Sequence, residues 1–197
     1  MRIIAGKYRG HKLVDFKAEH IRPTTDRVKE TLFNKLQFQI SGSRVADLFC
    51  GTGNLGLEAL SREAEFCTFV EKSPQSVAIT RQNIEKLKVP SNVYKVVTMD
   101  AISFLKAYPG PAFDIIFADP PFTQKLAHAV MTAASESAAF APHTVMAIES
   151  EQKEKMEKQY GDLILFDKKT FGDKFLNMFC HKEALPAESS EKENDDE

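Results

Sequence analysis

A glycine-rich turn stands at positions 47–56, where the chain reads DLFCGTGNLG. The apolar run Val45–Phe49 predicts a buried strand that leads into this turn, and the stretch Leu55–Ser61 predicts a helix that leaves it. Glycines between a strand and a helix let the backbone approach a bound cofactor where a side chain would clash. The spacing Gly51-x-Gly53-x-x-Gly56 occurs in sites for nicotinamide dinucleotides and for S-adenosylmethionine. By itself the turn therefore predicts a nucleotide-type cofactor without choosing between the two.

Downstream of this turn, short β-branched or aromatic runs alternate with amphipathic stretches. Such alternation is typical of parallel βαβ units in a doubly wound sheet. The predicted strands are Val45–Phe49, Cys67–Glu71, Val93–Met99, Ile115–Ala118 and Val145–Glu149. The predicted helices are Leu55–Ser61, Pro74–Leu87, Ala101–Tyr108, Leu126–Glu136 and Glu151–Tyr160.

Two more predicted strands, Leu163–Lys168 and Phe175–His181, close the domain. The residues between them are too few for a crossover helix, so this last pair is expected to be an antiparallel hairpin. The fold class is therefore α/β and Rossmann-like, with a mainly parallel sheet and a C-terminal antiparallel hairpin.

We expect three parts: a basic N-terminal arm over residues 1–23, one α/β domain over residues 24–183, and a disordered acidic tail over residues 184–197. Apolar runs around Gly6 and Gly10 predict a small β-hairpin in the arm. A helix is expected to begin near Thr24 or Thr25, with one apolar face formed by Val28, Leu32, Leu36 and Ile40. The tail has too few apolar residues to offset the entropy of ordering it.

The net charge of −2 hides an uneven distribution of charge. Residues 1–35 carry nine Lys/Arg and four Asp/Glu, whereas residues 183–197 carry seven acidic residues and one lysine. A basic start favours a polyanionic partner, and an uneven but solvated surface is the alternative.

The composition is that of a protein of the reducing cytoplasm. At 197 residues the chain is long enough for one domain with a full core. It contains no apolar run long enough to span a membrane and no long apolar N-terminal stretch of the secretory type. Three cysteines far apart predict neither a disulfide framework nor a metal site.

Carboxylates stand at the ends of successive predicted strands. Glu71 ends the second strand, where a carboxylate can accept hydrogen bonds from both hydroxyls of a ribose. Asp100 follows the third strand, where it can reach an adenine amino group. Ligands of open α/β sheets bind at this carboxyl edge, so the series predicts a cofactor site.

The fourth strand ends in Asp119-Pro120-Pro121-Phe122. Two prolines remove two backbone donors, so carbonyl groups and the neighbouring side chains face the site. An exocyclic base nitrogen is a poor nucleophile, and the Asp119 carboxylate and the Pro120 carbonyl would hold its N–H groups and stabilise the charge that develops on it. Phe122 offers a stacking face for an extruded base. We predict that these four residues are catalytic.

The chain resembles the RsmD family of bacterial methyltransferases, which methylate guanine N2 in small-subunit ribosomal RNA. Asp119–Phe122 resembles the (Asp/Asn)-Pro-Pro-(Tyr/Phe/Trp) motif of amino-group methyltransferases, and Asp47–Gly53 resembles their cofactor loop. Three further stretches narrow the resemblance to this family: RIIAGKYRG at 2–10, RPTTDRVKETLF at 22–33 and GLEALSR at 56–62. One departure is Phe171-Gly172-Asp173-Lys174, where the family usually has Tyr-Gly-Asp-Thr.

The resemblance implies S-adenosylmethionine as the cofactor and no metal. It also adds residues to the predicted cofactor site and to the predicted substrate-binding site. The expected cofactor residues are Asp47, Phe49, Gly51, Gly53, Glu71 and Asp100. The residues expected to bind the substrate are Lys7, Tyr8, Arg9, Arg22, Thr24, Thr25 and Arg27, of which the cations suit phosphates and Tyr8 suits base stacking. The expected partner is ribosomal RNA within a small-subunit assembly particle. The protein is expected to act as a monomer and not to bind a membrane.

Three other functions use part of the same pattern. A DNA or RNA adenine-N6 or cytosine-N4 methyltransferase would use the same catalytic motif, although this chain has little room for a DNA target-recognition region. A nicotinamide-dependent dehydrogenase would use the glycine turn but has no need of Asp119–Phe122. A nonenzymatic RNA-binding factor would explain the basic arm and leave the carboxylate series without a role.

Overall fold

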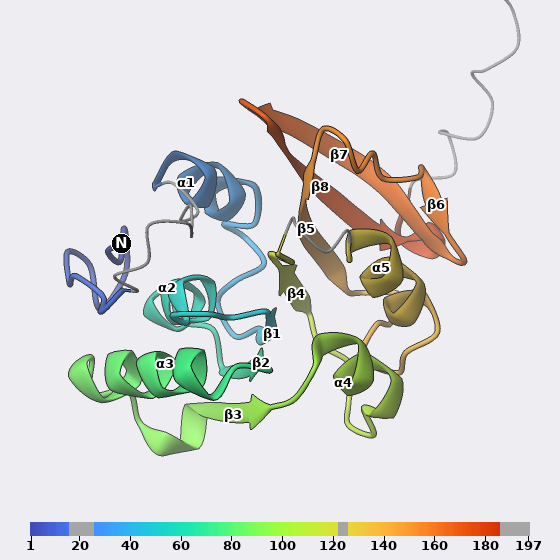
Figure 1. Ribbon diagram of the computed structural model, residues 1–197. Coiled ribbons are helices and arrows are strands. Elements are labelled where there is room, and N and C mark those ends of the chain that lie inside the picture. The colour runs from blue at the N-terminus through green and yellow to red at the C-terminus, as the bar shows by residue number, and fades with distance from the viewer. Residues whose placement is uncertain (16–25, 122–125, 186–197) are drawn as a thin grey trace, which may run out of the picture.

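The computed structural model describes residues 1–15, 26–121 and 126–185, and these form an α/β fold around an eight-stranded sheet (Figure 1). The strand order is β3-β2-β1-β4-β5-β8-β7-β6. The strands are β1 (Arg44–Leu48), β2 (Phe66–Glu71), β3 (Tyr94–Thr98), β4 (Ile115–Ala118), β5 (Val145–Glu151), β6 (Gln159–Tyr160), β7 (Leu163–Phe171) and β8 (Lys174–His181).

The first five strands form the parallel half of the sheet. β1 pairs with both β2 and β4, β3 pairs with β2, and β5 pairs with β4. β4 is buried along its whole length, and so are the last four residues of β1. A parallel strand covered on both faces reads as a continuous apolar run, which is why the sequence predicts these strands correctly.

The C-terminal half of the sheet is antiparallel, as predicted. β8 runs antiparallel to both β5 and β7, and β7 and β8 are joined by a tight turn at Gly172 and Asp173. Gly172 has a φ of 60°, a left-handed conformation that glycine adopts without steric cost. Because β7 continues to Phe171, this hairpin is longer than the sequence predicts.

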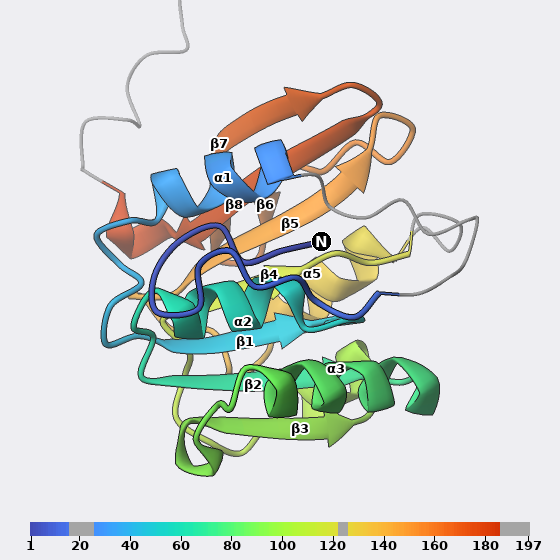
Figure 2. The ribbon, with the colours of Figure 1, turned by 90° about the vertical axis from the view of Figure 1, so that its left-hand side faces the viewer.

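Helices cover both faces of the sheet (Figure 2). One hydrophobic cluster contains side chains of α1 (Asp26–Lys35), α2 (Asn54–Ser61) and α3 (Pro74–Lys86). A second cluster, on the opposite face, contains side chains of α4 (Ala101–Ala107) and α5 (Ala127–Ser135). Short 3-10 turns at Ser91–Val93 and Lys182–Ala184 complete the described elements. Within these ranges no helix has the length and apolar character needed to cross a bilayer.

The predicted helix over Glu151–Tyr160 is wrong. β5 continues to Glu151, the chain then turns, and Tyr160 belongs to β6. Met156 and Tyr160 are spaced four residues apart, which imitates one face of a helix, but each is buried as an anchor of an irregular loop. The loop is also held by Glu154, whose carboxylate accepts the Ala127 N–H at the start of α5 (2.9 Å). Tertiary contacts of single side chains therefore override the local spacing here.

The N-terminal segment (residues 1–15), where a small basic hairpin is predicted, packs against the domain. It forms one antiparallel bridge between Arg2 and Lys12. Ile3, Tyr8 and Leu13 are at most 7% exposed and belong to the core cluster beneath α1 and α2. The predicted boundary between residues 23 and 24 lies outside the described residues, as does the predicted tail beyond Leu185.

Glu58 of α2 holds the N-terminal segment in place. Its fully buried carboxylate accepts the backbone N–H groups of Ile4 (2.8 Å) and Ala5 (3.0 Å) and also binds Arg62 (2.8 Å). Lys29 of α1, which is 1% exposed, lies 3.0 Å from the same carboxylate and donates to the Asn54 side chain (2.8 Å) and to the Arg2 carbonyl. One buried ion pair therefore joins the N-terminal segment, α1 and α2.

The contact between Gly6 and α2 yields a stability prediction. Gly6 and Gly10 both have a left-handed φ, of 78° and 83°. A Cβ on Gly6 would lie 1.8 Å from the Ser61 carbonyl oxygen, whereas a Cβ on Gly10 would meet nothing within 4 Å. Gly10→Ala should cost only the left-handed penalty of about 1–2 kcal/mol, and Gly6→Ala should cost clearly more because the segment must also move off α2. Urea unfolding of both variants measures the difference, and equal costs would show that the segment is not packed on α2.

Candidate functional site

The candidate site lies where the direction of the sheet's connections reverses. The chain passes from β1 to β2 and β3 on one side, then returns to β4 on the other side of β1. Ligands of open α/β sheets bind beyond the carboxyl ends of the strands at such a switch point. The glycine loop follows β1 there, and Asp119 follows β4. The structure thus brings the two predicted motifs onto neighbouring strands.

The backbone of the glycine loop is tightly bound on its inner side. Cys50 N–H donates to the Val70 carbonyl (3.1 Å), and Gly53 N–H donates to the Cys50 carbonyl (2.7 Å). The Thr80 hydroxyl, from α3, donates to the Gly51 carbonyl (2.8 Å). Phe49, Gly51 and Gly53 all have positive φ, of 61°, 55° and 78°. For a residue with a side chain such as Phe49 this is uncommon, and it reflects the sharpness of the turn out of β1.

The three glycines of the loop face different surroundings. A Cβ on Gly56 would lie 2.4 Å from the Phe69 ring and 2.6 Å from the Cys67 sulfur, so this glycine permits α2 to pack closely on β2. A Cβ on Gly53 would also lie close to neighbouring side chains, at 3.1 Å from Thr80. A Cβ on Gly51 would meet only the Phe49 carbonyl oxygen, at 3.9 Å. The loop therefore presents open backbone at Gly51, where a ligand can approach.

Asp47 fixes the start of α2. Its carboxylate is 2% exposed and accepts the Gly56 N–H at 2.8 Å. Burial raises the pKa of Asp47 to about 7, the Gly56 hydrogen bond opposes this, and the nearby carboxylates of Asp119 and Glu71 raise the pKa further. Asp47 therefore supports the glycine loop from beneath. The carboxylates of Asp47, Glu71 and Asp119 are close enough to influence one another electrostatically.

Glu71 and Asp100 occupy the positions that the sequence predicts, at the ends of β2 and β3. The Glu71 carboxylate accepts the N–H groups of Gly51 (3.1 Å) and Ser73 (2.8 Å), which orient it beside the glycine loop. Asp100 caps α4 by accepting from Ile102 (3.1 Å) and Ser103 (3.0 Å), and both bonds use Oδ1. Asp100 is thus a helix cap, and its second oxygen is the one suited to an adenine amino group.

The structure describes the predicted catalytic motif up to Pro121. Asp119 and Pro121 are partly exposed, Pro120 is buried, and the motif directly follows the buried β4. Phe122 lies outside the described residues, and so do Arg22, Thr24 and Thr25. What the structure brings together is therefore Asp119 and Pro120, the glycine loop, and the carboxylates of Asp47 and Glu71.

Comparison with known proteins identifies the family. A model of the family described as "Conserved hypothetical protein 95" matches residues 1–180. A Haemophilus influenzae protein named "Ribosomal RNA small subunit methyltransferase D" is 40% identical over 153 residues, which cover 77% of this chain and 79% of the relative. A relative of the same name from Escherichia coli K12 is 40% identical over 152 residues, 77% of this chain and 75% of the relative. The chain belongs to the RsmD family of methyltransferases.

A solved structure agrees with this family assignment. The Escherichia coli protein titled "Putative methyltransferase yhhF" superimposes with a TM-score of 0.82 at 34% identity, covering 94% of this chain and 99% of that one. The predicted Rossmann-like methyltransferase fold is thereby confirmed, and the chain is a methyltransferase.

The predicted substrate residues of the N-terminal segment lie away from the catalytic motif. Lys7 and Arg9 are exposed, but the Lys7 N–H donates to the Ser61 carbonyl (2.7 Å) at the far end of α2 from the glycine loop. Seven residues of helix place that end about 10 Å from the loop. Tyr8 is 7% exposed, so its ring is not available for base stacking, which corrects that part of the prediction. Arg27 is exposed near the start of α1.

Several polar residues that support the site escape prediction from the sequence. Asn83 of α3 is fully buried; its side chain accepts the Val14 N–H (2.6 Å) and donates to the carbonyls of Val14 (3.0 Å) and Thr52 (2.9 Å). It thereby ties the N-terminal segment to the glycine loop. Thr80 and Asn83 lie between Val77 and Ile84 on the buried face of α3. Their position on an otherwise apolar face of α3 is the pattern from which Thr80 and Asn83 could have been identified.

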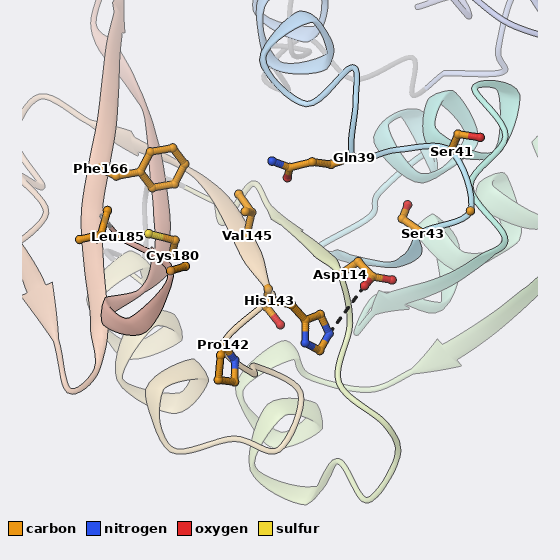
Figure 3. A pocket seen from close by; sticks show the side chains of 13 residues that line it. Gln39, Ser41, Ser43, Asp114, Pro142, His143, Val145, Phe166, Cys180 and Leu185 are labelled. Atoms are coloured by element: carbon orange, nitrogen blue, oxygen red, sulfur yellow. Dashed lines mark ion pairs between the residues drawn. The ribbon is translucent and has the colours of Figure 1, made fainter. Parts of the chain in front are cut away.

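A separate hollow of about 620 Å³ lies at the opposite edge of the sheet (Figure 3). It is bordered by residues that precede β1, β4 and β5, among them Ser43, Asp114 and Thr144. His143 and Asp114 approach each other there at 3.6 Å. Because this hollow is at the amino ends of the parallel strands, it is not the candidate site. Within the described ranges no cluster of His, Cys, Asp and Glu is suited to a metal.

The raised pKa of Asp47 predicts a pH dependence of stability. In the unfolded chain this carboxyl has its ordinary pKa near 4, so the folded state holds the proton more tightly up to a pH of about 7. The stability that Asp47 contributes is therefore present below pH ~4 and is lost as pH rises through about 7. An Asn side chain can still accept the Gly56 N–H but cannot ionise. Asp47→Asn should become more stable relative to the parent as the pH of urea unfolding rises from ~5 to ~8.

Asp162→Asn is the matched control for this measurement. The hydrogen bond from Lys182 lowers the pKa of the exposed Asp162, so its titration falls below the tested window. Its stability difference from the parent should change over the same pH range only through the charge of His181, which lies 3.8 Å from Asp162. A constant difference for Asp47→Asn would contradict the assignment of a raised pKa to Asp47.

Proposed function

We propose that this protein transfers the methyl group of S-adenosylmethionine to the exocyclic N2 amino group of a guanine in small-subunit ribosomal RNA. The observation that carries the proposal is the placement of Asp119-Pro120 beside the glycine loop, on the neighbouring strand at the switch point. The acceptor RNA is supported by the printed names of the relatives, and the guanine N2 position by the resemblance of the motif.

The residues of the site fit this cofactor. Open space at Gly51 leaves room for a ligand against the loop backbone, and Glu71 is oriented beside it to accept hydrogen bonds from ribose hydroxyls. Asp100 would accept from the adenine amino group through its second oxygen. When bound, the cofactor supplies an electrophilic methyl group on a positively charged sulfur.

The electrostatics of the site favour this cofactor over a nicotinamide dinucleotide. A dinucleotide places its pyrophosphate at the N-terminus of the helix after the glycine loop. Here the Gly56 N–H of α2 is already bound by Asp47, and Glu71 and Asp119 add negative charge to the same group. These carboxylates repel an anionic pyrophosphate and attract a sulfonium cation.

The catalytic residues act on the acceptor amino group. The Asp119 carboxylate and the Pro120 carbonyl accept its two N–H groups and turn its lone pair toward the methyl donor. As the new nitrogen–carbon bond forms and the donor's sulfur–methyl bond breaks, leaving a neutral thioether, positive charge develops on the nitrogen and the Asp119 carboxylate stabilises it. Asp119 or water then takes the released proton.

The test of this function identifies the methylated base. The full chain is incubated with labelled S-adenosylmethionine and one of three acceptors: naked small-subunit ribosomal RNA, partly assembled small-subunit particles, or DNA. Digestion to nucleosides should yield labelled N2-methylguanosine from an RNA acceptor. Labelled N6-methyladenine or N4-methylcytosine as the main product would refute the guanine assignment. Comparison of the naked RNA with the particles also tests the expected assembly-particle partner.

Replacement of Asp119 should separate catalysis from cofactor binding. Asp119→Ala removes an acceptor that acts on the reacting nitrogen, so the rate of methyl transfer should fall roughly a hundredfold or more. Affinity for S-adenosylhomocysteine, measured by calorimetry, should stay within a few-fold because the glycine loop and Glu71 are untouched. Asp162→Ala, on the surface beside Lys182, should change neither quantity. Near-normal turnover of Asp119→Ala would remove the catalytic assignment.

The exposed cations of the N-terminal segment should bind RNA without taking part in catalysis. For single strands the slope of log K against log salt is about −0.7 per neutralised phosphate, so Lys7→Ala with Arg9→Ala should flatten the slope by ~1.4. The turnover rate at saturating RNA should stay near that of the parent because both side chains lie at the far end of α2. An unchanged salt slope would show that this turn does not contact RNA.

A further inference from the structure

A buried ion pair lies beside the catalytic motif and has no part in the mechanism above. Glu149, near the end of β5, approaches Lys174, the first residue of β8, with 3.2 Å between Oε2 and Nζ. The two side chains are only 6% and 13% exposed.

Strand register places Glu149 next to Asp119. β4 and β5 are parallel, and their last paired residues are Ala118 and Ile148. Asp119 follows β4 directly, and Glu149 is the next residue of β5. Adjacent strands lie about 4.8 Å apart, and residues in register point to the same face.

Neighbouring residues identify the face of the sheet on which Asp119 and Glu149 lie. Phe117, two residues before Asp119, and Leu176, the cross-strand neighbour of Glu149, both belong to the cluster beneath α1 and α2. Asp119 also acts on Asp47, whose carboxylate bonds to α2 on this face. Asp119, Glu149 and Lys174 therefore follow one another across the carboxyl edge, on β4, β5 and β8.

Stability alone gives no reason for the ion pair. Removing two opposite charges from water generally costs about as much free energy as their attraction returns, and an apolar cross-strand pair would serve the sheet at least as well. A fixed carboxylate beside a fixed ammonium does, however, form an acceptor–donor pair of the kind that reads the edge of a base.

We propose that Glu149 and Lys174 read the Watson–Crick edge of the acceptor base and select guanine. This inference rests on the proposed function. The guanine edge presents, in order, the N2 amino group, N1–H and O6, which require two acceptors and then a donor. Asp119 with the Pro120 carbonyl meets N2, the Glu149 carboxylate accepts N1–H, and the Lys174 ammonium donates to O6. An extruded base is read in this way through its Watson–Crick edge.

The same pair rejects adenine and its analogues. Adenine and 2,6-diaminopurine carry a lone pair at N1 and an amino group at position 6, so the carboxylate would face a lone pair and the ammonium would face N–H groups. 2,6-Diaminopurine is the informative probe because it keeps a 2-amino group that Asp119 can hold. It therefore separates selection of the base from the chemistry of transfer.

The experiment compares two synthetic RNAs that span the guanine mapped in the acceptor assay. One carries guanine at that position, and the other carries 2,6-diaminopurine. The parent protein should methylate the guanine RNA about ten to a hundred times more efficiently, as expected for one good pair of base contacts. Glu149→Gln should narrow this ratio, since its amide can accept from N1–H or donate to an N1 lone pair. Lys174→Met should narrow it by weakening the reaction with guanine and by removing the donor that opposes the 6-amino group of 2,6-diaminopurine.

The controls distinguish a specificity role from a structural one. Glu157→Gln and Lys169→Met replace exposed residues of the same two types and should leave the ratio unchanged. Thermal unfolding and S-adenosylhomocysteine binding are measured for every variant. If the variants lose activity equally on both RNAs, Glu149 and Lys174 do not read the base and the inference fails. If Lys174→Met instead flattens the salt dependence of RNA binding, Lys174 contacts a phosphate, which also overturns it.

Failure of the proposed function would look different. In that case the parent protein would leave guanine unmethylated in the acceptor assay. A parent that methylates guanine N2 but accepts 2,6-diaminopurine equally well would keep the proposed function and refute only the role of Glu149 and Lys174.

Discussion

The buried pair of Glu58 and Lys29 is the interaction on which the arrangement around the site depends. Both side chains are at most 1% exposed, and burial lowers the pKa of Lys29 while Glu58 raises it. A buried charge of this kind is tolerated only when its partners are complete. Glu58 has two backbone N–H groups and two cations as partners, and Lys29 binds three oxygens. Loss of either residue would leave an uncompensated charge in the core, so α1, α2 and the N-terminal segment hold together as one unit.

This unit supports the glycine loop from its outer side. Lys29 binds Asn54 at the first turn of α2, and Asn83 joins Val14 of the N-terminal segment to the Thr52 carbonyl. From the inner side, Asp47 binds Gly56 and Glu71 binds Gly51. The loop is therefore held on both sides, with open backbone at Gly51. A site held in this way needs little rearrangement when a ligand binds, which is the condition for electrostatic stabilisation of a transition state.

The sequence predicts those features that depend on local pattern. The parallel strands, the glycine loop, the C-terminal hairpin and the positions of Glu71 and Asp119 all follow from apolar runs and from what ends them. It fails where one distant contact decides the outcome. Met156 and Tyr160 have helical spacing but anchor a loop, and Lys29, in a helix with polar neighbours, gives no sign that Glu58 buries it. The position of Tyr8 between Lys7 and Arg9 predicts an exposed aromatic ring, but the ring packs in the core next to α2.

Negative and positive charges lie in different regions of the molecule. Glu71 and Asp119 make the carboxyl edge of the sheet acidic, which suits the proposed cationic methyl donor but repels the phosphates of RNA. Exposed cations such as Lys7 and Arg9 lie instead at the far end of α2. If those cations hold RNA as proposed, only a base turned out of its stack is expected to reach Asp119. The same acidity would be complementary to the N–H groups of an extruded base, and Lys174 places a cation beside Glu149 at this edge. Exclusion of phosphate and recognition of the base thus follow from one set of carboxylates.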